Sequence, residues 1–87
     1  MVEFDWDDHN IEYILEHGIE SYEAEQVFED MDRCSLNAHS GRKKLVGMTD
    51  DGRILTIIYE MRGKKIRVCT GWDAAEYERK SYNRRRR

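Results

Sequence analysis

The sequence predicts an α+β domain in which two helices precede three or four antiparallel strands and a last helix follows them. In residues 8–29, apolar side chains recur every three or four residues, as they do along the buried face of a helix. From residue 33 the pattern changes to short apolar runs bounded by glycine turns, which indicates strands. Eighty-seven residues support one core. We therefore expect a single domain over residues 1–83, followed by a basic tail at 84–87.

Both predicted N-terminal helices have recognisable ends. The first runs over residues 8–17, because Asp7 is suited to accept the free N–H groups of a first turn and Gly18 to end the helix in a left-handed conformation. The second runs over residues 22–29, and Ser21 is its expected cap. Both helices are strongly acidic outside their apolar stripes, so we interpret them as structural supports.

The strands are expected over residues 33–38, 42–49, 54–59 and 66–70. The third of these is apolar on both faces, which is typical of a central strand that is covered on both sides. Glycine-containing turns separate it from its neighbours, as in antiparallel hairpins. Asp73 is the expected cap of the last helix.

Charge is divided sharply along the chain. Residues 1–32 hold twelve Asp/Glu and no Lys/Arg, a formal charge of −12, and residues 33–87 hold fifteen Lys/Arg against six Asp/Glu, a formal charge of +9. A basic C-terminal part that ends in Arg84–Arg87 favours binding to a polyanion, above all nucleic acid. The alternative is that the two parts neutralise each other across the fold, or between copies in a structural oligomer.

Several classes of protein are disfavoured by the sequence. No apolar run approaches the roughly 18 residues of a membrane span, and the acidic start is unlike a signal peptide, so we expect a cytoplasmic protein without membrane contact. Cys34 and Cys69 are expected to be free thiols, with a redox pair or a metal site as the alternative. The sequence has neither zinc-ligand spacing nor a phosphate-binding glycine loop, so we expect neither metal nor cofactor.

Five stretches of the chain follow the motifs of one known family in order and at similar spacing. They are Phe4-Asp5-Trp6-Asp7 (F-x-W-D), His17-Gly18-Ile19 (K-H-G-V), Glu23-Ala24 with Val27-Phe28-Glu29-Asp30 (E-A-x-x-V-F-x-D), Gly47 with Gly52-Arg53, Leu55 and Tyr59 (G-x-x-x-x-G-R-x-L), and Arg67, Ala74, Glu78-Arg79 and Tyr82 (R-x-I-S-A-R-x-A-x-x-x-E-R-x-x-Y). In these stretches, which span nearly the whole chain, the protein resembles the BrnT family of bacterial toxins, which share the RelE-like fold.

The resemblance implies a metal-independent endoribonuclease that inhibits translation and acts as the toxin of a type II toxin–antitoxin pair. It also implies a ribbon-helix-helix antitoxin as partner, with which the toxin forms a hetero-oligomer that represses its own promoter; a homo-oligomer is the other assembly considered. One family arginine, in S-A-R, aligns with Trp72. The alternative function is therefore a non-catalytic RNA- or protein-binding module that kept the fold and lost this active-site arginine.

Cleavage of RNA without a metal requires charge stabilisation at phosphorus and two proton transfers. Arginine suits the first task because its planar fork holds two phosphate oxygens. We predict catalytic roles for Arg42, Arg62, Arg67 and Tyr82, and RNA contacts from Lys43, Lys44, Lys64, Lys65, Trp72, Arg84 and Arg85.

For several of these residues a structural role is the alternative. The arginines would then keep sheet edges soluble, and Trp72 and Tyr82 would pack beneath the last helix. Among the histidines, only His39 lies near the basic segment in the sequence, whereas His9 and His17 fall in the acidic helices. We expect the sheet and the last helix to gather their cations into one hollow, with the first two helices facing away from it.

Overall fold

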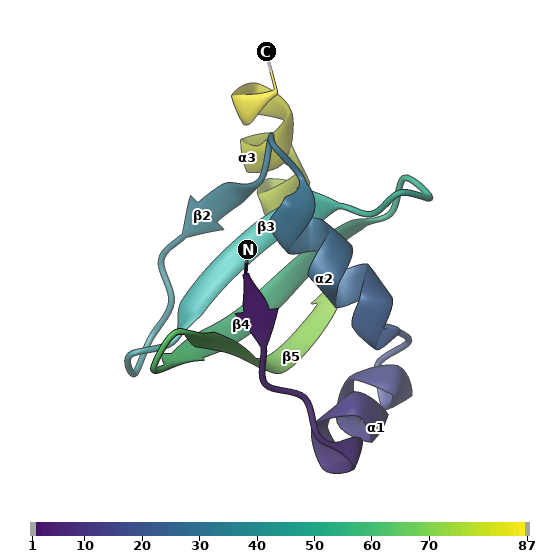
Figure 1. Cartoon of the computed structure of the whole chain (residues 1–87). Helices are drawn as coiled ribbons and strands as arrows, with labels where there is room; N and C mark the ends of the chain where they lie inside the picture. The colour runs from purple at the N-terminus through teal and green to yellow at the C-terminus, as the bar shows by residue number, and fades with distance from the viewer. Residues whose placement is uncertain (1, 87) are drawn as a thin grey trace.

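The computed structural model describes residues 2–86 and shows one sheet with helices on both of its faces (Figure 1). The order of elements confirms the α+β class. The elements are β1 (Glu3–Phe4), α1 (Asp8–Glu16), α2 (Ser21–Glu29), β2 (Cys34–Leu36), β3 (Lys43–Met48), β4 (Ile54–Arg62), β5 (Lys65–Asp73) and α3 (Glu76–Arg85).

The sheet has five strands in the order β1-β5-β4-β3-β2 and is mixed, so the prediction of three or four purely antiparallel strands is wrong. The added strand is β1, which lies parallel to β5 and pairs Glu3 with Lys65 and Phe4 with Ile66. Two residues are too few to show any periodicity, which explains why the sequence did not reveal this strand. The remaining four strands were expected, and β4 and β5 form a longer hairpin than predicted.

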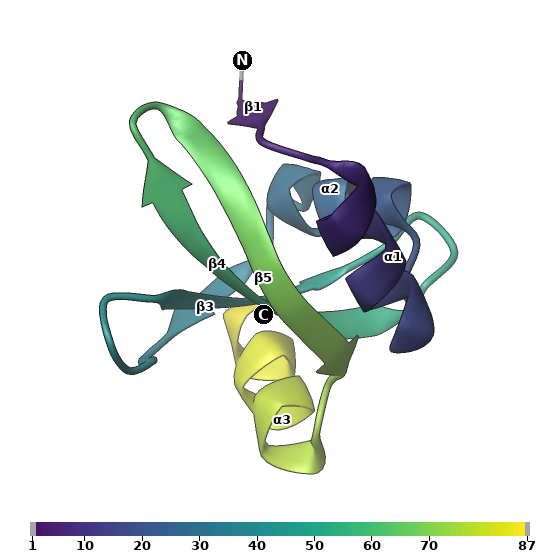
Figure 2. The same ribbon diagram turned by 90° about the horizontal axis from the view of Figure 1, so that it is seen from below.

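Helices α1 and α2 cover one face of the sheet, and α3 covers part of the other (Figure 2). The larger core cluster joins Ile14 and Val27 of the helices to Leu55, Ile57 and Val68 of the sheet. The smaller cluster, of Val46, Ile54 and Tyr82, lies under α3. Residues 54–57 are all buried, which confirms that the doubly apolar run forms a central strand.

Two of the three predicted helix caps are wrong. Asp7 caps α1 as expected, since its Oδ1 accepts from the backbone N–H of Asn10 at 2.9 Å. The cap of α2 is Glu20, because Ser21 already lies inside the helix and the Glu23 carboxylate accepts from the Glu20 N–H at 2.9 Å. Asp73 ends β5 instead of opening α3.

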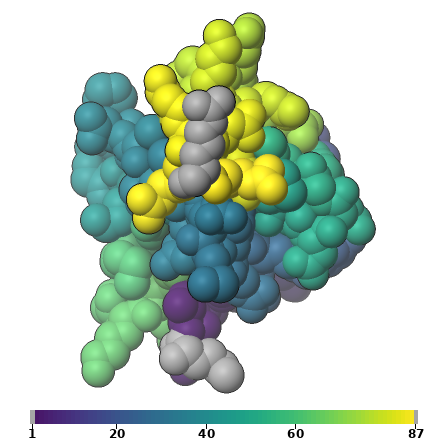
Figure 3. Space-filling view, turned by 90° about the horizontal axis from the view of Figure 1, so that it is seen from above, coloured from purple at the N-terminus to yellow at the C-terminus, as the bar shows by residue number. Residues whose placement is uncertain are grey.

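Helix α3 begins at Glu76, after the cap residue Ala75, and continues to Arg85. The predicted basic tail therefore starts inside this helix, and Arg87 lies outside the described residues. The end of α3 lies beside the segment around Arg33 (Figure 3), where the Arg85 Nε donates to the Arg33 carbonyl at 3.2 Å.

Candidate functional site

A pocket of about 370 Å³ runs from the start of β3 across β4 and β5 to the first turns of α1. Arg42, Arg62 and Arg67 all line this pocket, which we call the arginine pocket. The sheet register explains their proximity, since Glu60 pairs with Arg67 and Arg62 with Lys65, while Arg42 immediately precedes β3. Arg42 and Arg67, which are 25 positions apart in the sequence, thus line the same pocket.

The expectation that the first two helices face away from the arginines is wrong for α1. The Asn10 Nδ2 donates to the Val68 carbonyl of β5 at 2.8 Å in a buried hydrogen bond. This bond fixes the first turn of α1 against β5, so that His9 and Tyr13 form one wall of the arginine pocket.

Arg67 is held firmly within the pocket. Its Nη2 lies 2.9 Å from the Asp7 Oδ2, and its Nη1 donates to the Asp5 carbonyl at 3.0 Å. Its side chain is only 14% exposed. The Asn10 backbone N–H, followed by the Arg67 guanidinium, lowers the pKa of Asp7 below its ordinary value. Asp7 therefore remains a carboxylate that orients Arg67.

Arg62 and Arg42 are more open to solvent. The Arg62 Nε lies 3.3 Å from the Glu60 Oε1, and its Nη1 lies 3.8 Å from the Asp5 Oδ2. Its side chain is 56% exposed, so these ion pairs are weak and exchange readily with another anion. Arg42 is exposed at the start of β3.

A second hollow adjoins the arginine pocket and shares Arg42 and Thr70 with it. Trp72, Lys44 and His39 line this second hollow. The open face of the sheet therefore continues from the arginine pocket towards the start of α3.

Two residues predicted to contact RNA take part in a buried network around Glu78. The Lys44 Nζ lies 2.7 Å from the Glu78 Oε2, and the Trp72 Nε1 donates to the Glu78 Oε1 at 3.1 Å. Partial burial lowers the pKa of Lys44, but its bonds to Glu78 and Tyr77 outweigh this effect and the net shift is upward. Lys44 is consequently committed to the fold, whereas Trp72 as a residue is 37% exposed.

Tyr82, predicted to act in catalysis, lies apart from the arginine pocket. It is 1% exposed, packs with Val46 and Ile54, and donates its hydroxyl to the Asp30 Oδ2. Burial and the Asp30 carboxylate raise the pKa of Tyr82 far above its ordinary value. This geometry supports the alternative role, in which the ring packs α3 onto the sheet.

We expect Tyr82→Phe to lower the free energy of unfolding by about 2 kcal/mol, because the variant loses a hydrogen bond to a charged acceptor. Urea unfolding monitored by circular dichroism measures the change. Tyr22→Phe is the matched control, since Tyr22 is 54% exposed on α2. Equal unfolding midpoints for Tyr82→Phe and wild type would contradict this role.

The remaining predicted cations fall into two groups at opposite ends of the molecule (Figure 1). Lys43, Lys64 and Lys65 are exposed at the start of β3 and in the β4–β5 hairpin, close in sequence to the arginines of the pocket. Arg84 and Arg85 lie at the far end of α3. The prediction of one continuous hollow for all the cations is therefore wrong.

Sequence reasoning did not place His9 or Glu60 in the arginine pocket. The strand register held a signal for Glu60, since an extended β4–β5 hairpin places it opposite Arg67. Nothing local in the sequence places His9 there, because its position depends on how α1 docks on β5.

Across residues 2–86, no three His, Cys, Asp or Glu side chains come together as metal ligands would. In the same part of the chain, every helix is too short or too polar to cross a membrane.

Comparison with known proteins identifies one family. The profile described as "Ribonuclease toxin, BrnT, of type II toxin-antitoxin system" matches residues 6–78, most of the chain. This range contains every residue named above as lining the arginine pocket. A search of curated proteins finds no match. The chain therefore belongs to the BrnT family of ribonuclease toxins of type II toxin–antitoxin systems.

Proposed function

We propose that this protein is an endoribonuclease that inhibits translation by cutting RNA without a metal ion, and that the arginine pocket holds the scissile phosphate. The observation that supports this most is the meeting of Arg42, Arg62 and Arg67 in one pocket. Guanidinium groups bind phosphate oxygens in pairs and stay charged while negative charge builds at phosphorus. A RelE-like fold is part of the proposal.

The three arginines suit different parts of this task. Arg67 is oriented in advance by Asp7 and the Asp5 carbonyl, so it needs little reorganisation when the transition state forms. Arg62 makes only long, exposed ion pairs, and a phosphate can replace its carboxylate partners at low cost. Exposed Lys64 and Lys65 in the nearby hairpin attract the RNA backbone without fixing its position.

The proposal includes a partner and a setting. Membership in the family implies an antitoxin, and we propose that it carries a ribbon-helix-helix domain, assembles with the toxin in a hetero-oligomer and acts in the cytoplasm. A search for a short neighbouring reading frame of this type, followed by co-purification, tests this part.

The experiment is an RNA cleavage assay in EDTA, with the protein freed from antitoxin by denaturation and refolding. Wild type should cut RNA, and Arg62→Ala should reduce kcat by about 10²–10³-fold, as loss of one transition-state donor does. Arg79→Ala on α3, also an exposed arginine, is the control and should cut normally. Wild-type protein that neither cuts RNA nor slows growth on induction would refute the function.

A second candidate is a non-catalytic RNA-binding module, and the observation that favours it is Trp72 in the place of the family arginine. Its indole N–H is tied to Glu78, on the same open face as the arginine pocket. This candidate predicts RNA binding that weakens steeply with salt, without cleavage. Gain of cleavage in Trp72→Arg would assign the loss to that position.

A further inference from the structure

Glu60 and His9 both line the arginine pocket, although His9 belongs to the acidic N-terminal part of the chain and Glu60 to the basic C-terminal part. Glu60 lies on β4, in register with Arg67, and its Oε1 accepts from the Arg62 Nε at 3.3 Å. His9 lies in the first turn of α1, on the opposite wall. We propose that Glu60 is the general base and His9 the general acid of RNA cleavage. This inference rests on the proposed ribonuclease function.

Hydrogen bonds and strand pairing of the fold position both side chains. His9 follows the cap residue Asp7, which is bound to Arg67, and precedes Asn10, which is bound to the Val68 carbonyl. The two bonds fix the turn that carries the imidazole. Glu60 is held in place by the pairing of β4 with β5. The register of this pairing shifts at Cys69, which has no partner because Ile58 pairs with Thr70 and Tyr59 with Val68.

The reaction needs one group that accepts a proton and another that donates one. In this proposal Glu60 is the acceptor and His9 is the donor. The Glu60 carboxylate removes the proton of a ribose 2′-OH, and the 2′-oxygen forms a bond to phosphorus. The bond from phosphorus to the 5′-oxygen breaks, and the His9 imidazolium donates its proton to that oxygen. The products are a 2′,3′-cyclic phosphate end and a 5′-OH end. Proton exchange with water then restores both side chains.

Other groups in the pocket are less suited to act as the base. Burial raises the pKa of the Cys69 thiol, so the thiol remains protonated. The Asp7 carboxylate is committed to the α1 cap and to Arg67. By contrast, the Glu60 carboxylate forms one hydrogen-bonded ion pair within residues 2–86, with the Arg62 guanidinium.

The test compares Glu60→Gln and His9→Gln with wild type in a single-turnover cleavage assay across pH. In each variant the single-turnover rate constant for cleavage should fall about 10²–10⁴-fold, while the affinity for RNA stays at the wild-type value. Wild type should give a bell-shaped profile, Glu60→Gln should lose its acidic limb, and His9→Gln its alkaline limb. The groups facing this pair are Arg62 of β4, Arg67 and Cys69 of β5, Arg42 before β3, Asp5 and Asp7 before α1, and Tyr13 of α1.

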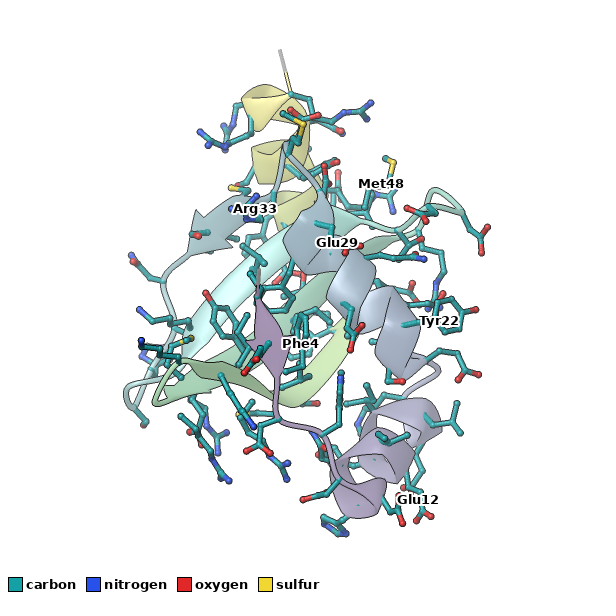
Figure 4. All side chains as sticks on the ribbon, in the orientation of Figure 1. Phe4, Glu12, Tyr22, Glu29, Arg33 and Met48 are labelled. Carbon is teal, nitrogen blue, oxygen red and sulfur yellow. The ribbon has the colours of Figure 1, made fainter. Side chains whose placement is uncertain are left out.

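Glu29→Gln and His17→Gln are the matched controls, because both residues are exposed outside the pocket; Glu29 is labelled on α2 in Figure 4. They should cut at the wild-type rate. His39→Gln tests the histidine of the adjoining hollow and should also retain cleavage.

Each result that contradicts the expectation would overturn a different part of the proposal. A wild type that cleaves, with Glu60→Gln equally active or faster because Arg62 is released, would overturn the assignment of the base alone. Retained activity in His9→Gln, or its loss in His39→Gln, would overturn that of the acid. A wild type that binds but never cleaves RNA would overturn the ribonuclease function together with this inference.

Discussion

Replacing Glu78 with alanine is expected to lower the free energy of unfolding by about 3–5 kcal/mol, the usual cost of removing one partner of a buried ion pair. Glu78 is 1% exposed, and its Oε1 accepts from the Thr56 hydroxyl at 2.8 Å and the Ala75 N–H at 2.7 Å. Its Oε2 faces Lys44, whose side chain is 11% exposed. Without Glu78, the Lys44 ammonium stays buried against Trp72 with no counter-ion. Urea unfolding measures the loss.

The pH dependence of this difference is a second check on the same variant. Burial raises the pKa of Glu78, but the bonds from Lys44, the Ala75 N–H and other donors outweigh burial and lower it from 4.5 to about 2. A carboxyl whose pKa is lower in the folded state stabilises the fold above its unfolded value of 4.5, and this contribution is lost as the pH falls towards 2.

The gap between wild type and Glu78→Ala should therefore narrow on acidification below pH 4.5. Glu76→Ala is the control, since Glu76 forms an exposed pair with Lys80 at 3.4 Å and should change stability by less than about 0.5 kcal/mol. A gap that stays constant down to pH 2 would contradict the role given to the Glu78 carboxylate.

Arg53→Ala is expected to lower the free energy of unfolding by about 3 kcal/mol. This value is at the lower end of the range for breaking a buried ion pair, because Arg53 is partly exposed. The Arg53 Nη1 lies 2.9 Å from the Glu23 Oε2 and donates to the Gly18 carbonyl at 3.0 Å, while its Nη2 lies 3.1 Å from the Asp73 Oδ1. Glu23 is only 6% exposed, so the variant leaves a buried carboxylate unpaired. Thermal and urea unfolding report the effect.

A double-mutant cycle separates the ion pair from the loss of the arginine side chain. Arg53→Ala together with Glu23→Ala should cost less than the sum of the two single changes, because each single variant already breaks the pair. Arg79→Ala again serves as the surface control. Additive losses would show that Arg53 and Glu23 stabilise the fold independently.

Elements with a local signal were predictable from the sequence. The apolar spacing of residues 8–29 and the cap at Asp7 located both N-terminal helices to within about a residue, and the doubly apolar run of β4 marked the centre of the sheet. The caps at Glu20 and Ala75 were missed because a glutamate in the first turn supplies the bond, so the cap residue itself needs no oxygen of the usual kind. For β1, pairing with a distant strand is the only signal.

The site was predictable only where strand register determines it. Arg42, Arg62 and Arg67 meet because hairpins align them, whereas His9 reaches the pocket through the docking of α1. Nothing in the sequence distinguishes Lys44 and Tyr82 from an exposed lysine or tyrosine. Only their burial in the structure shows that their polar atoms stabilise the fold.

The alternative reading of the divided charge, in which the two parts neutralise each other across the fold, is confirmed in part. Asp5, Asp7 and Glu23 of the acidic third pair with Arg62, Arg67 and Arg53. Glu12 and Glu29 point outward from the helices (Figure 4), and the arginine pocket is a basic concavity in a molecule with a net charge of −3.

The parallel pairing of β1 with β5 also determines when the molecule can become complete during synthesis. The bonds from Arg67 to the Asp5 carbonyl and from Asn10 to Val68 span 62 and 58 positions. During synthesis, β1 and α1 emerge from the ribosome before β5, so they lack their packing partner until β5 has emerged. A nascent chain in which β5 has not yet emerged therefore has no finished arginine pocket.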